Sequence, residues 1–205
     1  MSNMELWRSV QRTDPKYTKE VGQRGGYHAI GGQYQLMMAT EQWGPYGSEW
    51  GLRDLQYSYE EDATGAKCIA LEAYFFWPGG QFPISVDMVF KANDDCRKKL
   101  LTSARSKALS YLGFNADVFL GKFDDNHYVS EAETYYGEKA ALRKNALIKI
   151  RLAQTDESLA LCRQRVEGLL SEDAIGSELC EELLKAIDDR EQELHAPQEP
   201  EGSEA

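Results

Sequence analysis

The chain has 205 residues and a formal net charge of −11, from 23 Lys and Arg against 34 Asp and Glu. This length is enough to bury the core of one main domain and to carry a smaller appendage. No run approaches about 18 apolar residues, and the N-terminal sequence MSNMELWRSV has no apolar signal-peptide core. We therefore expect neither a membrane protein nor a secreted one.

The acidic excess lies entirely in the C-terminal quarter. Residues 155–205 contain 15 acidic and 4 basic residues, whereas residues 1–154 contain 19 of each. Because net charge bears on partners and not on the fold, a neutral body with a local basic patch remains compatible with a polyanionic ligand. The four cysteines are widely spread and form no zinc-type spacing, which favours reduced thiols in a cytoplasm and no metal site.

The N-terminal region mixes cations with aromatic rings. After a short helical lead-in and a turn at Thr13-Asp14-Pro15, a flexible loop is expected at 23–26, followed by a helix over Gln33–Trp43 that Gly44-Pro45 ends. The cations Lys16, Lys19 and Arg24 lie beside Tyr17 and Tyr27, a pattern suited to single-stranded nucleic acid. The alternative is a Gly-rich surface loop whose aromatic residues belong to the core.

The middle of the chain predicts a three-stranded antiparallel meander over Trp50–Asp62, Ala66–Trp77 and Phe82–Lys91, with a turn at Pro78-Gly79-Gly80. Alternation is clearest in the last strand, whose inward-facing residues are Ile84, Val86, Met88 and Phe90.

A long basic helix follows the meander. Asn93, Asp94 and Asp95 are candidate N-caps, and the helix extends to about Leu112, where Gly113 can end it. At about 100° per residue, the arc expected to face the sheet contains Leu100, Leu101, Ala104, Ala108, Tyr111 and Leu112. Lys98 and Arg105 fall on one flank of this arc, and Lys107 falls on the other. Strands and helix together predict an α+β fold.

The helix region carries a local excess of positive charge. The segment from Lys91 to Lys107 holds two acids and six basic residues, namely Lys91, Arg97, Lys98, Lys99, Arg105 and Lys107. Such a surface attracts anions and could bind an anionic partner. The alternative interpretation is that these basic residues form only a solvated flank of the helix.

The remainder is expected to be helical after a loop over FNADVFLGKFDDNHYV. Asp117, Asp124, Asp125 and His127 in this loop match no metal-site spacing, so capping and turn roles are preferred. A helix from Ser130 to Gln154 completes a core domain of residues 1–154. Residues 155–195 are expected to form a small acidic helical hairpin, and residues 196–205 a disordered acidic tail.

Motifs for catalysis are missing from the sequence. There is no GxxxxGK[ST] phosphate loop, no GxSxG, no HExxH and no Cys–His pair suited to nucleophilic chemistry. Glu72 and Asp87 lack the Glu-x-Lys partner of a carboxylate nuclease. We therefore expect a protein that is not an enzyme and that needs no cofactor.

Three blocks together resemble a known family. They are T-D-P-x-x-T-K at 13–19, Ala39-Thr40-Glu41 followed by G-P-Y-G-S-E-W-G, and LTSARSKALSYLGFNADVFLGKFDD at 101–125. In this order they are similar to phage single-strand annealing proteins, the group that contains Sak, Erf, Red-beta and the eukaryotic Rad-fifty-two-type proteins. The resemblance spans roughly residues 13–128.

The resemblance implies ATP-independent annealing of single-stranded DNA by a homo-oligomeric ring or filament, in the cytoplasm of a bacterial host. The family's basic helix typically carries T-D-x-x-K-[KR]-A-L, whose basic pair meets phosphate. Here Lys107 matches one of the pair, Ser106 replaces the other and Ser103 replaces the Asp, with Arg105 one position away as the candidate substitute. The expected DNA-binding residues are Lys107, Arg105, Lys98, Lys91, Arg97, Lys99, Lys16, Lys19, Arg24, Trp43 and Tyr46.

Trp43 and Tyr46 are aromatic candidates for base stacking, although a Gly-Pro turn flanked by tryptophans also suits a core. The partners implied are single-stranded DNA, an annealed duplex intermediate and, through the C-terminal region, an exonuclease or a single-strand-binding protein. A single-stranded DNA-binding protein without annealing activity and a protein-assembly module remain open.

Overall fold

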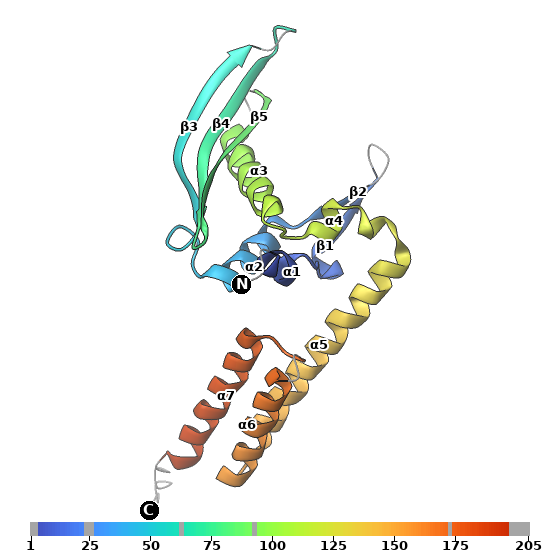
Figure 1. Ribbon diagram of the computed structural model, residues 1–205, viewed down its shortest axis with the longest axis vertical. Helices are drawn as coiled ribbons and strands as arrows, with labels where there is room; N and C mark the ends of the chain where they lie inside the picture. Colours follow the sequence, from blue (N-terminus) through green and yellow to red (C-terminus); the bar gives the residue numbers. More distant parts are fainter. Residues whose placement is uncertain (1–3, 23–26, 62–63, 92–93, 172–173, 197–205) are drawn as a thin grey trace, which may run out of the picture. The chain divides into compact units, whose positions relative to one another are not determined.

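The computed structural model describes residues 4–22, 27–61, 64–91, 94–171 and 174–196, and it divides into two units, Met1–Glu133 and Thr134–Ala205 (Figure 1). The fold is mixed α+β, as predicted. In the first unit the elements are α1 (Glu5–Val10), the 3-10 helix η1 (Pro15–Tyr17), β1 (Thr18–Val21), β2 (Tyr27–Ile30), α2 (Gly32–Trp43), β3 (Gly51–Glu61), β4 (Lys67–Trp77), β5 (Gly80–Val89), α3 (Cys96–Tyr111), α4 (Ala116–Phe119), η2 (Lys122–Asp124) and the start of α5 (Asn126–Leu152).

The main sheet is the predicted antiparallel meander, in the order β3-β4-β5. Leu71 in the central strand lies opposite both Tyr57 of β3 and Val86 of β5. The pairing of Trp77 with Gly80 leaves Pro78-Gly79 as a two-residue turn. The alternation predicted for the last strand is confirmed, because Ile84 and Val86 are buried on the same face as Leu71.

The basic helix α3 lies along one face of this sheet, as Figure 1 shows. It ends where predicted, at Gly113, which has a φ of +95° that side chains rarely adopt. A Cβ on Gly113 would also lie 2.6 Å from the ring of Trp7, so glycine lets α1 pack closely against the end of α3.

The predicted inner arc of α3 is correct at Leu100, Ala104 and Ala108, which are buried, and wrong at Tyr111, which is 57% exposed. Leu109 was placed outside the arc and is fully buried. The physical reason is a second layer. Helix α2 packs against α3 on the side that carries Ser106, so this part of the helix surface is covered as well.

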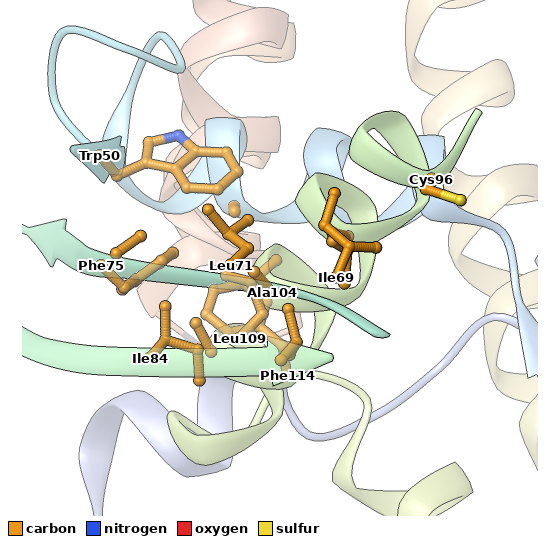
Figure 2. Packing of buried hydrophobic residues seen from close by; sticks show 14 of the residues in the cluster. Trp50, Ile69, Leu71, Phe75, Ile84, Cys96, Ala104, Leu109 and Phe114 are labelled. Atoms are coloured by element: carbon orange, nitrogen blue, oxygen red, sulfur yellow. The ribbon is translucent and has the colours of Figure 1, made fainter. Parts of the chain in front are cut away.

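Large side chains from distant segments form the core between α3 and the sheet (Figure 2). Trp50, Phe75 and Phe114 are each 0% exposed. A buried aromatic side chain removes about 150 to 250 Å² from water, which stabilises the fold by about 4 to 6 kcal/mol per ring at 25 cal/mol per Å². These three buried side chains therefore hold the helix, the sheet and the turn after α3 together.

A two-stranded hairpin precedes α2. In β1 and β2, Lys19 lies opposite Ala29 and Thr18 lies opposite Ile30. The sequence predicts only a loop in this region, because strands of four residues are too short to show a clear alternation of apolar and polar residues. The loop predicted at 23–26, with Arg24, lies outside the described residues.

A buried polar network joins the N-terminal segment to α4. The carboxylate of Asp117 accepts hydrogen bonds from the Thr13 backbone N–H (2.8 Å), the Thr13 hydroxyl (2.6 Å), the Tyr128 hydroxyl (2.9 Å) and the Val118 N–H (2.9 Å). Asn115 donates to the Thr13 hydroxyl at 3.0 Å. Burial, followed by the hydrogen bond to Asp117, raises the pKa of Tyr128 from 10.0 to about 12, so this phenol keeps the proton that it donates to Asp117 even in moderately alkaline solution.

The second unit contains the rest of α5 with α6 (Asp156–Ser171) and α7 (Ser177–His195). The two helices predicted after residue 155 are confirmed. The division at Glu133 comes earlier than the expected boundary after Gln154, because the α5 residues Leu142, Ala146 and Ile150 pack in the same apolar cluster as α6 and α7. Of the expected tail, residues 196–205, all but Ala196 lie outside the described residues. Within the described ranges, no helix is long and apolar enough to cross a membrane.

The position of this division predicts different behaviour for two truncations. A chain that ends after Glu133 should stay soluble, because no part of the second apolar cluster remains. A chain that ends after Gln154 should aggregate, because it keeps Leu142, Ala146 and Ile150 without the helices that cover them. Light scattering of the two purified chains checks this. Equal solubility would show that the apolar residues at the end of α5 can be exposed without causing aggregation.

Candidate nucleic-acid interface

Three of the cations of α3 lie on the side of the helix that faces β3. The guanidinium carbon of Arg97 is 4.9 Å from the centre of the Tyr57 ring, and that of Arg105 is 5.8 Å from the centre of the Tyr46 ring. Lys98 is seven residues, or about two turns, before Arg105 and so lies on the same side. We call Arg97, Lys98, Arg105, Tyr46 and Tyr57 the β3-side flank.

The β3-side flank combines uncompensated charge with aromatic rings. Among the described residues, no carboxylate oxygen lies within 4.0 Å of a side-chain nitrogen of Arg97, Lys98 or Arg105. Arg97 and Lys98 are exposed, and Arg105 is half-buried. A guanidinium over an aromatic ring contributes about 0.5 to 1 kcal/mol at exposed sites. The rings therefore orient the arginines without cancelling their charge.

The other two basic residues of α3 lie elsewhere. The ammonium group of Lys107 donates to the backbone oxygen of Ser85 in β5 at 3.0 Å, on the opposite flank. The ammonium of Lys99 is 2.5 and 2.6 Å from the two oxygens of Asp94, and this contact raises the pKa of Lys99 and lowers that of Asp94. The six basic residues of the segment therefore do not form one surface.

Ser106, which stands where the resembled motif has a basic residue, is a packing contact. Its hydroxyl donates to the side-chain oxygen of Gln35, which is 2% exposed in α2. A long cation at this position would meet α2 and not solvent. The departure from the motif therefore matches the way α2 covers α3, and Arg105, one residue earlier, is half-buried and remains accessible.

The two described N-terminal cations, Lys16 and Lys19, have different surroundings. Lys16 is 2.7 Å from the carboxylate of Asp14 and 4.7 Å from the centre of the Tyr17 ring, and the bond to Asp14 raises its pKa. Tyr17 in turn stacks on Tyr34 with ring centres 4.3 Å apart. Lys19 is exposed in β1, and Lys91 is exposed after β5. Lys16 is thus largely neutralised, and Arg24 lies outside the described residues.

The two aromatic candidates have different positions. Tyr46 is 44% exposed and contacts Arg105, so it lies on the β3-side flank. Trp43 packs against Trp50, Phe75 and Phe114, with ring centres 5.9, 6.3 and 5.0 Å away. These contacts do not support the prediction that Trp43 stacks bases, because the half-buried ring packs against the core.

Two aromatic residues of β3 were missed. Tyr57 and Tyr59 both face the α3 side of the sheet, opposite Leu71 and Ile69. Tyr59 is 57% exposed. The period-two spacing of these tyrosines within a predicted strand is a signal that could have placed them on one face.

The opposite face of the sheet has the reverse charge. Glu60, Glu72 and Asp87 alternate with the inward residues and are exposed, against one cation, Arg53. A polyanion is repelled by such a face. The β3-side flank is accordingly the part of the sheet domain that suits nucleic acid.

The acids after α3 have structural roles. Asp117 belongs to the buried network, and Asp125 accepts from the His127 N–H at 2.9 Å at the start of α5. In the described part of the chain, no group of three or more His, Cys, Asp or Glu side chains could hold a metal ion. Comparison with protein-family models and with curated protein sequences finds no match to this chain.

Proposed function

We propose that this protein binds single-stranded DNA through the β3-side flank and promotes the pairing of complementary strands without ATP. The observation that supports this best is the placement of Arg97 and Arg105 over tyrosine rings on one side of α3, free of carboxylates among the described residues. Cations that track a backbone beside aromatic rings that accept bases are the chemistry of sequence-independent single-strand binding.

Strand annealing asks for no energy source, because pairing of complementary strands is favourable. The protein has to screen phosphate repulsion and to hold bases unpaired until they meet. Arg97 and Arg105 are eight residues apart, which separates them by about 12 Å along the helix axis. Such a spacing allows the two residues to meet different phosphates of one extended strand.

The proposal includes a homo-oligomer. Each chain offers few phosphate contacts, so several copies on one strand are needed for tight binding, and repeated weak sites multiply their effect. Both outer strands of the main sheet, β3 and β5, have a neighbour on one side only. The proposal also assigns the acidic C-terminal unit to protein partners, an exonuclease or a single-strand-binding protein, because its charge opposes DNA.

A binding and annealing experiment with the full chain tests the proposal. Affinity for a fluorescent oligonucleotide should fall with salt, with a slope of log K against log[salt] near about −2, from about −0.7 for each of three flank cations. Two complementary oligonucleotides carrying a fluorophore and a quencher should pair at least about tenfold faster with protein and without ATP.

Each failure of this experiment has its own meaning. Binding without faster pairing would indicate a single-stranded DNA-binding protein that does not anneal. No binding at low salt would contradict the proposal as a whole and would favour the assembly module.

A further inference from the structure

An open pocket of about 410 Å³ lies under the first turn of α3, beside the β3-side flank. Its lining includes Ile69 and Cys96, which are buried, and the rings of Tyr59 and Phe90. Small-molecule sites in proteins have volumes of about 300 to 1,000 Å³. The pocket is therefore large enough for a planar ring system.

An exposed aromatic surface lines the pocket. The rings of Tyr59 and Phe90 meet edge to face, with centres 5.5 Å apart and planes at 83°. Tyr59 remains 57% exposed although it lies on the α3 side of the sheet, opposite the fully buried Ile69. More than half of Tyr59 is therefore accessible, so a flat ligand can stack against it.

The rim of the pocket is charged, with Arg97 and Lys98 against Asp94 and Asp95. Lys99 holds the carboxylate of Asp94 at 2.5 and 2.6 Å, which compensates that acid. Arg97 and Lys98 then face the single carboxylate of Asp95, and the rim keeps a positive excess. An aromatic lining with a cationic rim matches a ligand that has a planar ring and a nearby anion.

We infer that this pocket receives one unstacked nucleobase of a bound strand, with the base against Tyr59 and its phosphate against Arg97 and Lys98. The inference rests on the proposed function and adds a base-binding subsite to it. A base stacked on an aromatic side chain contributes about 1 to 3 kcal/mol in single-strand binding. The subsite would hold one base out of the stack, beyond the phosphate contacts along α3.

A comparison of normal and abasic strands separates base binding from phosphate binding. The probes are a fluorescent thymidine oligonucleotide and a strand of equal length with the same phosphates but no bases. Fluorescence anisotropy with the full chain should give at least about fivefold tighter binding of the thymidine strand, the lower end of one stacking contact.

Substitution of Tyr59 then locates the effect. Tyr59→Leu should weaken binding of the thymidine strand by about fivefold or more and leave the abasic strand unchanged, whereas Tyr59→Phe should keep wild-type affinity for both. Tyr74→Leu is the matched control, because Tyr74 is 42% exposed on the opposite face of the same sheet. Tyr59 is exposed, so the fold should survive, and circular dichroism verifies this.

The outcomes distinguish the two proposals. If both strands bind and Tyr59→Leu changes neither affinity, or changes both equally, the base pocket is overturned while strand binding stands. If the wild-type chain binds neither strand, the proposed function itself fails, and the pocket fails with it.

Discussion

Replacing Asp117 by alanine is expected to lower the free energy of unfolding of the first unit by about 3 to 5 kcal/mol. The substitution removes the acceptor for the Thr13 N–H, the Thr13 hydroxyl and the Tyr128 hydroxyl. Thr13 is 0% exposed, so water cannot replace the lost bonds. Each buried donor left without a partner costs about 1 to 3 kcal/mol.

Urea denaturation followed by tryptophan fluorescence measures this loss in the correct unit, because every tryptophan of the chain lies in the first unit. The four are Trp7, Trp43, Trp50 and Trp77. Asp87→Ala is the control, since Asp87 is an exposed acid of β5, and it should change the free energy by less than about 0.5 kcal/mol. A similar small change for Asp117→Ala would mean that the network contributes little.

Reversing both arginines of the β3-side flank, Arg97→Glu with Arg105→Glu, is expected to weaken single-stranded DNA binding by about a hundredfold near 0.1 M salt. At that salt concentration, counterion release makes each phosphate contact worth about fivefold, and the two introduced carboxylates add repulsion. The salt slope should also become about 1.4 units shallower, from about 0.7 for each lost contact. Anisotropy titrations at several salt concentrations give both quantities.

The matched control for this reversal is Lys144→Glu with Lys149→Glu, two exposed lysines of α5 in the second unit. It changes the net charge by the same amount at residues that are not part of the flank, so binding should stay within about twofold. Equal losses in the two double variants would mean that the total charge governs binding and that the flank is no specific site. Unchanged tryptophan fluorescence would confirm that the first unit remains folded.

Local signals in the sequence account for the elements that were predicted correctly. Strict alternation from Ile84 to Phe90, a Pro-Gly turn and a glycine at the end of the helix each depend on a few neighbouring residues. The β1–β2 hairpin has no such signal, because its strands have four residues each. The boundary between the two units could not be predicted from the sequence either. The apolar residues of α5 indicate a helix, but they do not indicate which other helices it packs against.

The candidate site was predictable in part for the same reason. Helical spacing separated Lys98 and Arg105 from Lys107, and the structure places them on opposite flanks. The pairing of Lys99 with Asp94 and the packing of Trp43 against the core depend on tertiary geometry that residue spacing does not reveal. Asp117 looked like a turn residue, although its partner Thr13 is 104 positions away.

The contrast between the two faces of the main sheet gives each molecule a front and a back. On the proposed function, the arginines would attract phosphates, whereas Glu60, Glu72 and Asp87 on the opposite face would repel them. All copies bound along one strand would therefore have to turn the same face of their sheet towards the DNA. A complementary strand would then approach the bound strand from the side opposite to this acidic face.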